Sequence, residues 1–258
     1  MYQNKTALAL AFLLCFLTFS LSAQVKGTLN YKLTTNNPIG GITDVNSIVY
    51  FYGTKSIELT LPKNISNTII ADGDNSLVET KVIKSTKPSF VYKDFSKKEL
   101  QLSDFIEFNK YLITDTLSNF KWAITQEKKK ILNYTCTKAT TKFRGRQFEA
   151  WFTDAIPISN GPWKFCGLPG LIVAAKDLEG IYSYELTGIN LKASFDPKII
   201  SIPPSYSKSK AMNHSSFIAA YKKRVAQNAA RSRASEQQTS GGGSSSFTIT
   251  LPPKIEKF

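Results

Sequence analysis

A stretch dense in proline and glycine, Ile156 to Ile172, places the strongest constraint on how this chain can fold. It holds three of the 11 prolines and three of the 14 glycines, together with Trp163 and Cys166. Proline fixes φ and donates no backbone hydrogen bond, whereas glycine tolerates positive φ, so this stretch can be neither a regular helix nor an inner strand. Pro169 and Gly170 hold the second and third positions of a sequence that suits a type II turn. The stretch therefore predicts a packed corner that leads into a strand.

Short runs rich in β-branched and aromatic residues recur along the chain on both sides of this corner. Turn-forming residues separate the runs, and no long helical periodicity is present before residue 190. This rhythm predicts a mainly β, antiparallel fold, either a strongly curved sheet or a sandwich. The expected strands are 25–34, 46–52, 56–61, 81–85, 89–94, 99–108, 120–126, 131–141, 147–153, 171–176 and 182–189.

The first 23 residues have the pattern of a secretory signal peptide. Lys5 precedes an apolar run from Ala7 to Phe19, and small residues follow before Gln24. The apolar run is too short to span a bilayer. We therefore expect residues 1–23 to be removed and the protein to be exported to the periplasm or the cell surface.

Two cysteines remain after the signal peptide, Cys136 and Cys166. In an oxidising compartment two cysteines suggest one disulfide. Such a bridge would close a loop of about 30 residues and stabilise the fold by about 3–4 kcal/mol. The alternative is a pair of buried thiols.

The net charge of +14 is concentrated toward the C-terminus. We expect a β domain over 24–197, which is only mildly basic, and a basic tail over 198–258. A basic tail either stays solvated or binds an anionic surface, such as lipid headgroups or an acidic protein. The export signal argues against nucleic acid as the partner.

Within the tail, residues 213–234 have the pattern of the only good helix. Ser215 or Ser216 can cap its start, and an apolar residue recurs every four positions. These apolar positions are Phe217, Tyr221, Val225 and Ala229. The helix either packs on the sheet through this stripe or binds a membrane surface. Residues 240–246 form a flexible Gly/Ser linker, and a short apolar segment follows at 247–251.

Residues capable of acid–base or metal chemistry are few and scattered. A hydrolytic triad needs a histidine or another base beside its nucleophile, and the only histidine, His214, lies in the basic tail just before the predicted helix. No group of His, Cys, Asp and Glu has the spacing of a metal site. We therefore predict no catalytic residue, no metal and no cofactor.

Aromatic and cationic residues near the corner are a better indication of binding, because both are favoured where proteins grip ligands or partners. Arg144 and Arg146 are expected as exposed cations at a hairpin tip. The alternative is that the tryptophans only seal the core. The candidate binding surface consists of Trp151, Trp163, Lys164, Arg144 and Arg146.

The hexapeptide in this corner is the signature of the GLPGLI family of exported proteins, and the chain resembles that family over roughly residues 25–195. The hexapeptide is Gly167-Leu168-Pro169-Gly170-Leu171-Ile172. The upstream segments that carry the resemblance are Trp122, Tyr134–Thr140, Phe143–Arg146, Ala150–Thr153, Ile156–Ile158 and Gly161–Phe165. The family has no established activity, so the resemblance implies an envelope location and a fold but no reaction. The strand rhythm also resembles the half-barrel of LolA-like lipid carriers, and a fold does not determine a function.

Taken together, these patterns favour a non-enzymatic envelope protein that binds an apolar ligand or a protein partner near the corner. An alternative within the same class is an accessory subunit of an outer-membrane transport system. The alternative from another class is an envelope hydrolase that uses a pair of carboxylates, although the sequence places no two carboxyl groups at a defined separation.

Overall fold

The computed structural model of the chain describes the residue ranges 25–37, 41–60, 70–71, 77–78, 88–107, 109–117, 120–239 and 254–257. Four expected features lie outside these ranges: the signal peptide 1–23, the strand 81–85, the linker 240–246 and the apolar segment 247–251.

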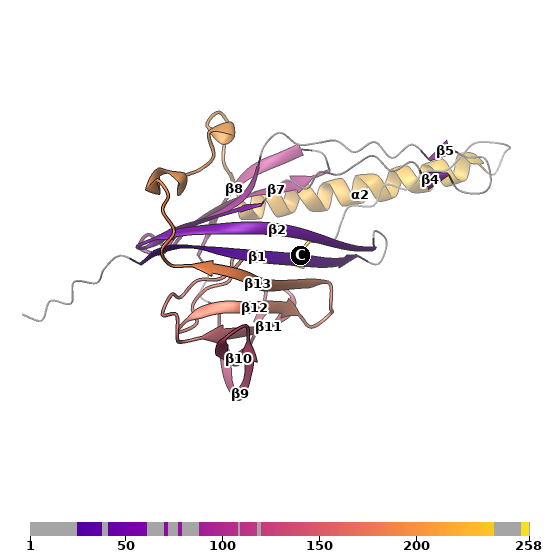
Figure 1. Cartoon of the computed structure of the whole chain (residues 1–258). Coiled ribbons are helices and arrows are strands. Elements are labelled where there is room, and N and C mark those ends of the chain that lie inside the picture. The colour runs from indigo at the N-terminus through magenta and orange to yellow at the C-terminus, as the bar shows by residue number, and fades with distance from the viewer. Residues whose placement is uncertain are drawn as a thin grey trace, which may run out of the picture.

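One open sheet of 12 strands forms the body of the protein (Figure 1). Neighbouring strands are antiparallel, except that β14 pairs in parallel with β8. In the order in which they lie side by side, the strands are β14 (Met212–Asn213), β8 (Asn109–Thr116), β7 (Glu99–Ile106), β6 (Ser89–Asp94), β3 (Lys55–Thr60), β2 (Gly41–Tyr52), β1 (Lys26–Asn37), β13 (Tyr182–Asn190), β12 (Leu171–Asp177), β11 (Arg146–Thr153), β10 (Tyr134–Phe143) and β9 (Ala123–Ile131). A separate pair consists of β4 (Ile70–Ala71) and β5 (Leu77–Val78). The predicted mainly β, antiparallel class is confirmed.

The alternation of side chains along β12 divides the core between two faces of the sheet. Ile172 belongs to a cluster that we call the corner cluster, whereas Leu171 and Val173 belong to a cluster on the other face. The corner cluster also contains the aromatic residues Phe120, Phe148, Phe152, Trp163, Phe165 and Tyr184. The Pro/Gly corner is therefore packed inward, as its apolar residues predict.

The two predicted disulfide cysteines are separate buried thiols in this structure. Cys166 packs in the corner cluster, and Cys136 packs in the cluster on the other face with Leu29 and Trp151. Because the sheet lies between the two clusters, the Cys136–Cys166 bridge is not formed, and the alternative of two buried thiols describes the structure.

After β13 the chain crosses the sheet and then forms the long helix α2 (His214–Thr239). Two short 3-10 helices, η1 (Pro197–Ile199) and η2 (Pro204–Tyr206), precede β14, and Tyr206 packs with Ile57 and Phe90 of the sheet. Among the described residues, no helix combines the length and the apolar character needed to cross a bilayer.

The start and the packing face of α2 differ from the prediction. Asn213 caps the helix, since its Oδ1 accepts hydrogen bonds from the Ser216 N–H and the Ser215 hydroxyl at 2.8 Å each. Phe217 is fully buried against β7 and β8, but Val225 is 41% exposed. The buried side continues instead to Asn228, whose amide donates to Glu107 at 3.0 Å. A strict four-residue repeat drifts around a helix of 3.6 residues per turn, so the predicted stripe leaves the contact after one turn.

Candidate functional site

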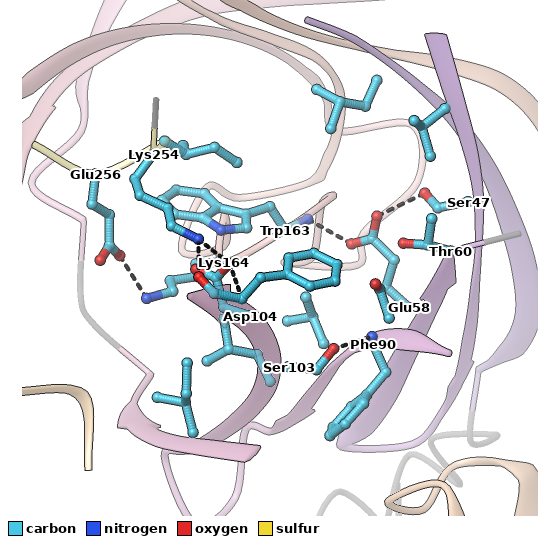
Figure 2. A pocket seen from close by; sticks show the side chains of 18 of the residues that line it. Ser47, Glu58, Thr60, Phe90, Ser103, Asp104, Trp163, Lys164, Lys254 and Glu256 are labelled. Carbon is cyan, nitrogen blue, oxygen red and sulfur yellow. Dashed lines mark hydrogen bonds and ion pairs between the residues drawn. The ribbon is translucent and has the colours of Figure 1, made fainter. Parts of the chain in front are cut away.

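A cavity of about 290 Å³ lies against the sheet, and His214 and Phe217 from the start of α2 line it. Figure 2 shows side chains that line this cavity. Side chains from β8, β7, β6, β3, β2, β1 and β13 all reach it, so the sheet must curl around this space. Trp163 of the corner, Phe217 of α2 and Ile255 near the C-terminus cover it. The apolar wall includes Leu33, Val45, Val91, Leu102, Ile113 and Tyr184.

The corner that supplies Trp163 is tied down by a buried lysine from β6. Lys93 is 2% exposed, and its Nζ donates to Asn160 Oδ1 at 3.0 Å, to Gly161 O at 2.8 Å and to Phe165 O at 3.1 Å. Burial lowers the pKa of Lys93 to about 8. The three protons of the ammonium group therefore pair three acceptors of the corner.

The hexapeptide does not form the predicted type II turn, and its two glycines serve different purposes. Gly167 has a φ of 90°, but Gly170 is not in the left-handed region, which the third position of a type II turn requires. Gly170 is needed for space, because a Cβ there would lie 2.0 Å from the carbonyl oxygen of Thr153. The motif thus allows the corner to pass directly against the end of β11.

Trp163 adopts a left-handed backbone conformation with a φ of 50°, which is uncommon for a bulky residue. Its backbone N–H donates a hydrogen bond to Glu58 Oε2 at 2.6 Å, and its indole ring packs against Phe143, Phe148 and Phe165. Strained residues of this kind gather at ligand-binding and active sites. Trp163 also lines the cavity, so the strained backbone lies next to the candidate binding site.

Charged side chains from five distant parts of the sequence meet at one end of the cavity and form what we call the charge cluster. Its members are Asp115, Arg144, Lys164, His214 and Glu256. Lys164 Nζ lies 2.8 Å from Asp115 Oδ2 and 2.5 Å from Glu256 Oε1. Arg144 bonds Asp115 through both terminal nitrogens at 2.8 Å, and His214 Nε2 lies 2.5 Å from Glu256 Oε2. Two carboxylates thus balance two fixed cations.

The charge cluster holds the C-terminal segment 254–257 over the cavity. Glu256 attaches this segment through its ion pair with Lys164, and the backbone N–H of Lys257 donates a hydrogen bond to Arg144 O at 3.0 Å. Burial, the largest influence, would raise the pKa of Asp115 and of Glu256. Hydrogen bonds and positive charges from Arg144, Lys164 and, at Glu256, His214 outweigh it and hold both pKa values below their usual range.

Asp115, His214 and Glu256 offer ligand atoms within 4.8 Å of one another, which is close enough for a metal ion. Both carboxylates, however, already accept hydrogen bonds from Lys164 and Arg144. A cation would have to displace these two side chains, so the donor set fits an ion-pair network better than a metal site.

The structure brings only part of the predicted binding surface to the cavity. Trp163 and Lys164 line it. Arg144 was expected to be an exposed cation, but its side chain is only 25% accessible, because it is paired with Asp115 in the charge cluster. Trp151 lies on the other face of the sheet, where Lys129 Nζ is 4.0 Å from its ring centroid.

Arg146 was expected to be exposed, but it is only 3% exposed. Its guanidinium lies 2.5 Å from Asp177 Oδ2 and also donates to the Ile255 carbonyl. The hairpin tip is covered by the C-terminal segment, which buries this cation. Sequence spacing could not predict this contact, because residue 255 is more than one hundred positions away.

Several residues of the site escaped the sequence analysis. Glu58 alternates with apolar neighbours in β3 and reads as a solvent-facing strand position, yet it is buried in the cavity. Lys93, Asp115 and Glu256 are isolated charges in sequence, and no local pattern marks them. His214 was expected only at the start of the helix, and it faces Glu256 as well.

Comparisons with known proteins add a family model and several structures of similar fold. The model described as "Protein of unknown function (Porph_ging)" matches residues 144–174, which span β11, the corner and the start of β12. No curated protein matches the chain. Membership of the GLPGLI family stays a prediction.

Among solved structures, PNGF-II in space group P21 is 16% identical with a TM-score of 0.49, over 78% of this chain and 34% of that one. PNGF-II in space group C2 is 16% identical with a TM-score of 0.47, over 77% of this chain and 32% of that one. The LolA superfamily protein NE2245 from Nitrosomonas europaea is 11% identical with a TM-score of 0.32, over 69% of this chain and 91% of that one. The chain spans about a third of the length of the PNGF-II chains.

Proposed function

We propose that this is a non-enzymatic binding protein that holds a small molecule with an apolar body in the cavity against its sheet. The observation that carries the proposal is the cavity of about 290 Å³, walled by apolar side chains and covered by Trp163, Phe217 and Ile255. Ligand sites are typically concave, mostly apolar and furnished with a few polar groups.

The pairing of charges supports binding rather than catalysis. Lys164 is paired with Asp115 and Glu256, and Lys254 lies 2.5 Å from Asp104 Oδ1. A general acid or base must exchange its proton with the substrate near neutral pH. Asp115 and Glu256, which are held ionised between cations, are poorly suited to that task, which disfavours a hydrolase that would use this pair of carboxylates.

The size of the cavity limits the ligand. Since one water molecule takes about 30 Å³ in the liquid, this space corresponds to roughly ten non-hydrogen atoms. We therefore propose a short-chain or single-ring ligand. An envelope location is part of the proposal and rests on the signal-peptide pattern of residues 1–23.

The test is binding of octan-1-ol to the purified protein, followed by calorimetry and by tryptophan fluorescence. Val45→Phe places a ring in the cavity and should abolish binding, because Val45 lines it from β2. Ile48→Phe is the matched control, since Ile48 lies on the same strand and does not line the cavity. Equal binding by the two variants, or no binding by the unchanged protein, would refute the proposal.

A further inference from the structure

The end of the cavity opposite the charge cluster is built around a single buried carboxylate. Glu58 lies on β3 between Ile57 and Leu59 and is 7% exposed. Its Oε1 accepts a hydrogen bond from the Ser47 hydroxyl at 2.7 Å, and its Oε2 accepts one from the backbone N–H of Trp163 at 2.6 Å. Figure 2 shows Ser47 and Trp163 on either side of this carboxylate. The side chain is therefore held in one orientation at the cavity wall.

Glu58 differs from the other acidic groups of the cavity in its charge balance. Asp104 is paired with Lys254, and Glu256 is paired with Lys164 and Arg144. Among the residues that the structure describes, no lysine, arginine or histidine forms an ion pair with Glu58. Acidic side chains are rarely buried without a paired cation, because a lone charge is costly to remove from water, so Glu58 stands out in a protein of net charge +14.

Lys93 does not fill the role of the missing cation. Its charge and that of Glu58 influence each other, but burial is the larger influence on Lys93 and lowers its pKa to about 8. All three hydrogens of its Nζ have acceptors in the corner, at Asn160, Gly161 and Phe165. No ammonium hydrogen of Lys93 is left for Glu58.

The carboxylate keeps acceptor capacity for a ligand. Its two oxygens offer about four lone-pair sites, and the contacts with Ser47 and Trp163 use two of them. Tyr184 lines the same cavity, and aromatic rings favour a nearby cation. An ammonium group placed here would satisfy Glu58 through charge-assisted hydrogen bonds while its carbon chain lies along the apolar wall.

We propose that Glu58 selects ligands with a positively charged amine head and a short apolar body. This inference rests on the proposed binding function and assigns the chemical class of the ligand at that site. The charge cluster at the opposite end is already neutralised internally, so the amine is oriented toward β3 and the apolar body toward Phe217.

The test compares octylamine, octan-1-ol and sodium octanoate at pH 7, below any concentration at which they aggregate. The unchanged protein should bind octylamine at least about tenfold more tightly than octan-1-ol, and octanoate most weakly. Glu58→Gln keeps the shape and the hydrogen-bond acceptor but removes the charge. It should lose the preference for octylamine and keep its affinity for octan-1-ol, which also reports that the variant is folded.

Glu185→Gln is the matched control, because Glu185 is an exposed strand residue whose side chain is 59% accessible. It should leave all three affinities unchanged. If octan-1-ol binds and octylamine has no advantage, or if Glu58→Gln keeps that advantage, the assignment of Glu58 is overturned while the binding function stands. If octan-1-ol does not bind the unchanged protein, the proposed function itself is refuted, whatever the two charged compounds do.

Discussion

Replacing Lys93 with methionine tests whether one buried ammonium group holds the corner in place. The substitution keeps the length and apolar body of the side chain but removes the donors to Asn160 Oδ1, Gly161 O and Phe165 O. These acceptors belong to the loop that places Trp163 over the cavity. We expect a less stable protein with a looser corner, and weaker ligand binding as a consequence.

Two opposing effects determine the magnitude. Hydrogen bonds to charged groups contribute about 1.5–3 kcal/mol each, so the loss of three such bonds costs roughly 4.5–9 kcal/mol. Against this, a folded pKa of about 8 for Lys93, instead of 10.5, means that burying the charge costs about 3 kcal/mol near neutral pH. The free energy of unfolding should therefore fall by roughly 1.5–6 kcal/mol in the variant at pH 7.

The pH dependence gives the reasoning a second, independent check. Between pH 8 and 10.5 the unfolded chain carries the proton of Lys93 and the folded chain does not, so the stability of the unchanged protein rises with pH. The difference from Lys93→Met should widen over this window by up to about 3 kcal/mol.

Urea unfolding followed by tryptophan fluorescence at pH 7 and pH 9.5 measures both effects. Lys97→Met, at an exposed position of the β6–β7 turn, is the control and should change little. The account is refuted if Lys93→Met is as stable as this control, or if its difference from the unchanged protein does not grow at pH 9.5.

Two further predictions concern the hexapeptide and the charge cluster. Gly170→Ala should lower the free energy of unfolding by at least about 3 kcal/mol, because its Cβ would lie 2.0 Å from Thr153 O. Gly180→Ala, at a φ of 72° in open space, is the control and should cost only about 1–2 kcal/mol. Equal effects of the two substitutions in thermal unfolding would contradict this prediction. Glu256→Gln should cost about 3–5 kcal/mol at pH 7. Because the folded pKa of Glu256 is depressed, the advantage of the unchanged protein is present above the ordinary pKa near 4 and should shrink as pH falls below it. Hydrogen exchange of the Lys257 amide in the two proteins measures this difference in stability. A difference that stays constant down to pH 2 would contradict the prediction.

Local patterns in the sequence were sufficient for the strand class and for the position of the corner. Residues 171–176 and 182–189 alternate or run apolar between turn residues, and β12 and β13 lie there. The density of proline and glycine at 156–170 excludes a regular helix or inner strand there, whatever the rest of the chain does. The basic run Lys128–Lys130 lies on β9, the exposed strand at one end of the sheet, as a charged edge should.

The type II turn and the helix stripe could not be predicted correctly from spacing alone. At Gly170 the decisive contact is with Thr153, on a neighbouring strand, and it requires space rather than positive φ. On α2 the hydrogen bond with Glu107 places Asn228, and not the predicted Ala229, on the buried side of the helix. Both outcomes depend on a neighbour that the local sequence does not contain.

By itself the sequence determined that this chain forms an antiparallel sheet interrupted by one rigid corner, since backbone preferences and side-chain alternation act over a few residues. Only the tertiary structure decided that Glu58 is buried with no ion-pair partner among the described residues, that Lys93 supports the corner, and that Asp115, Arg144, Lys164, His214 and Glu256 meet. The reason is physical: burial and charge pairing depend on distances in space, and the folded chain brings together positions up to 141 residues apart, since Lys164 pairs with both Asp115 and Glu256.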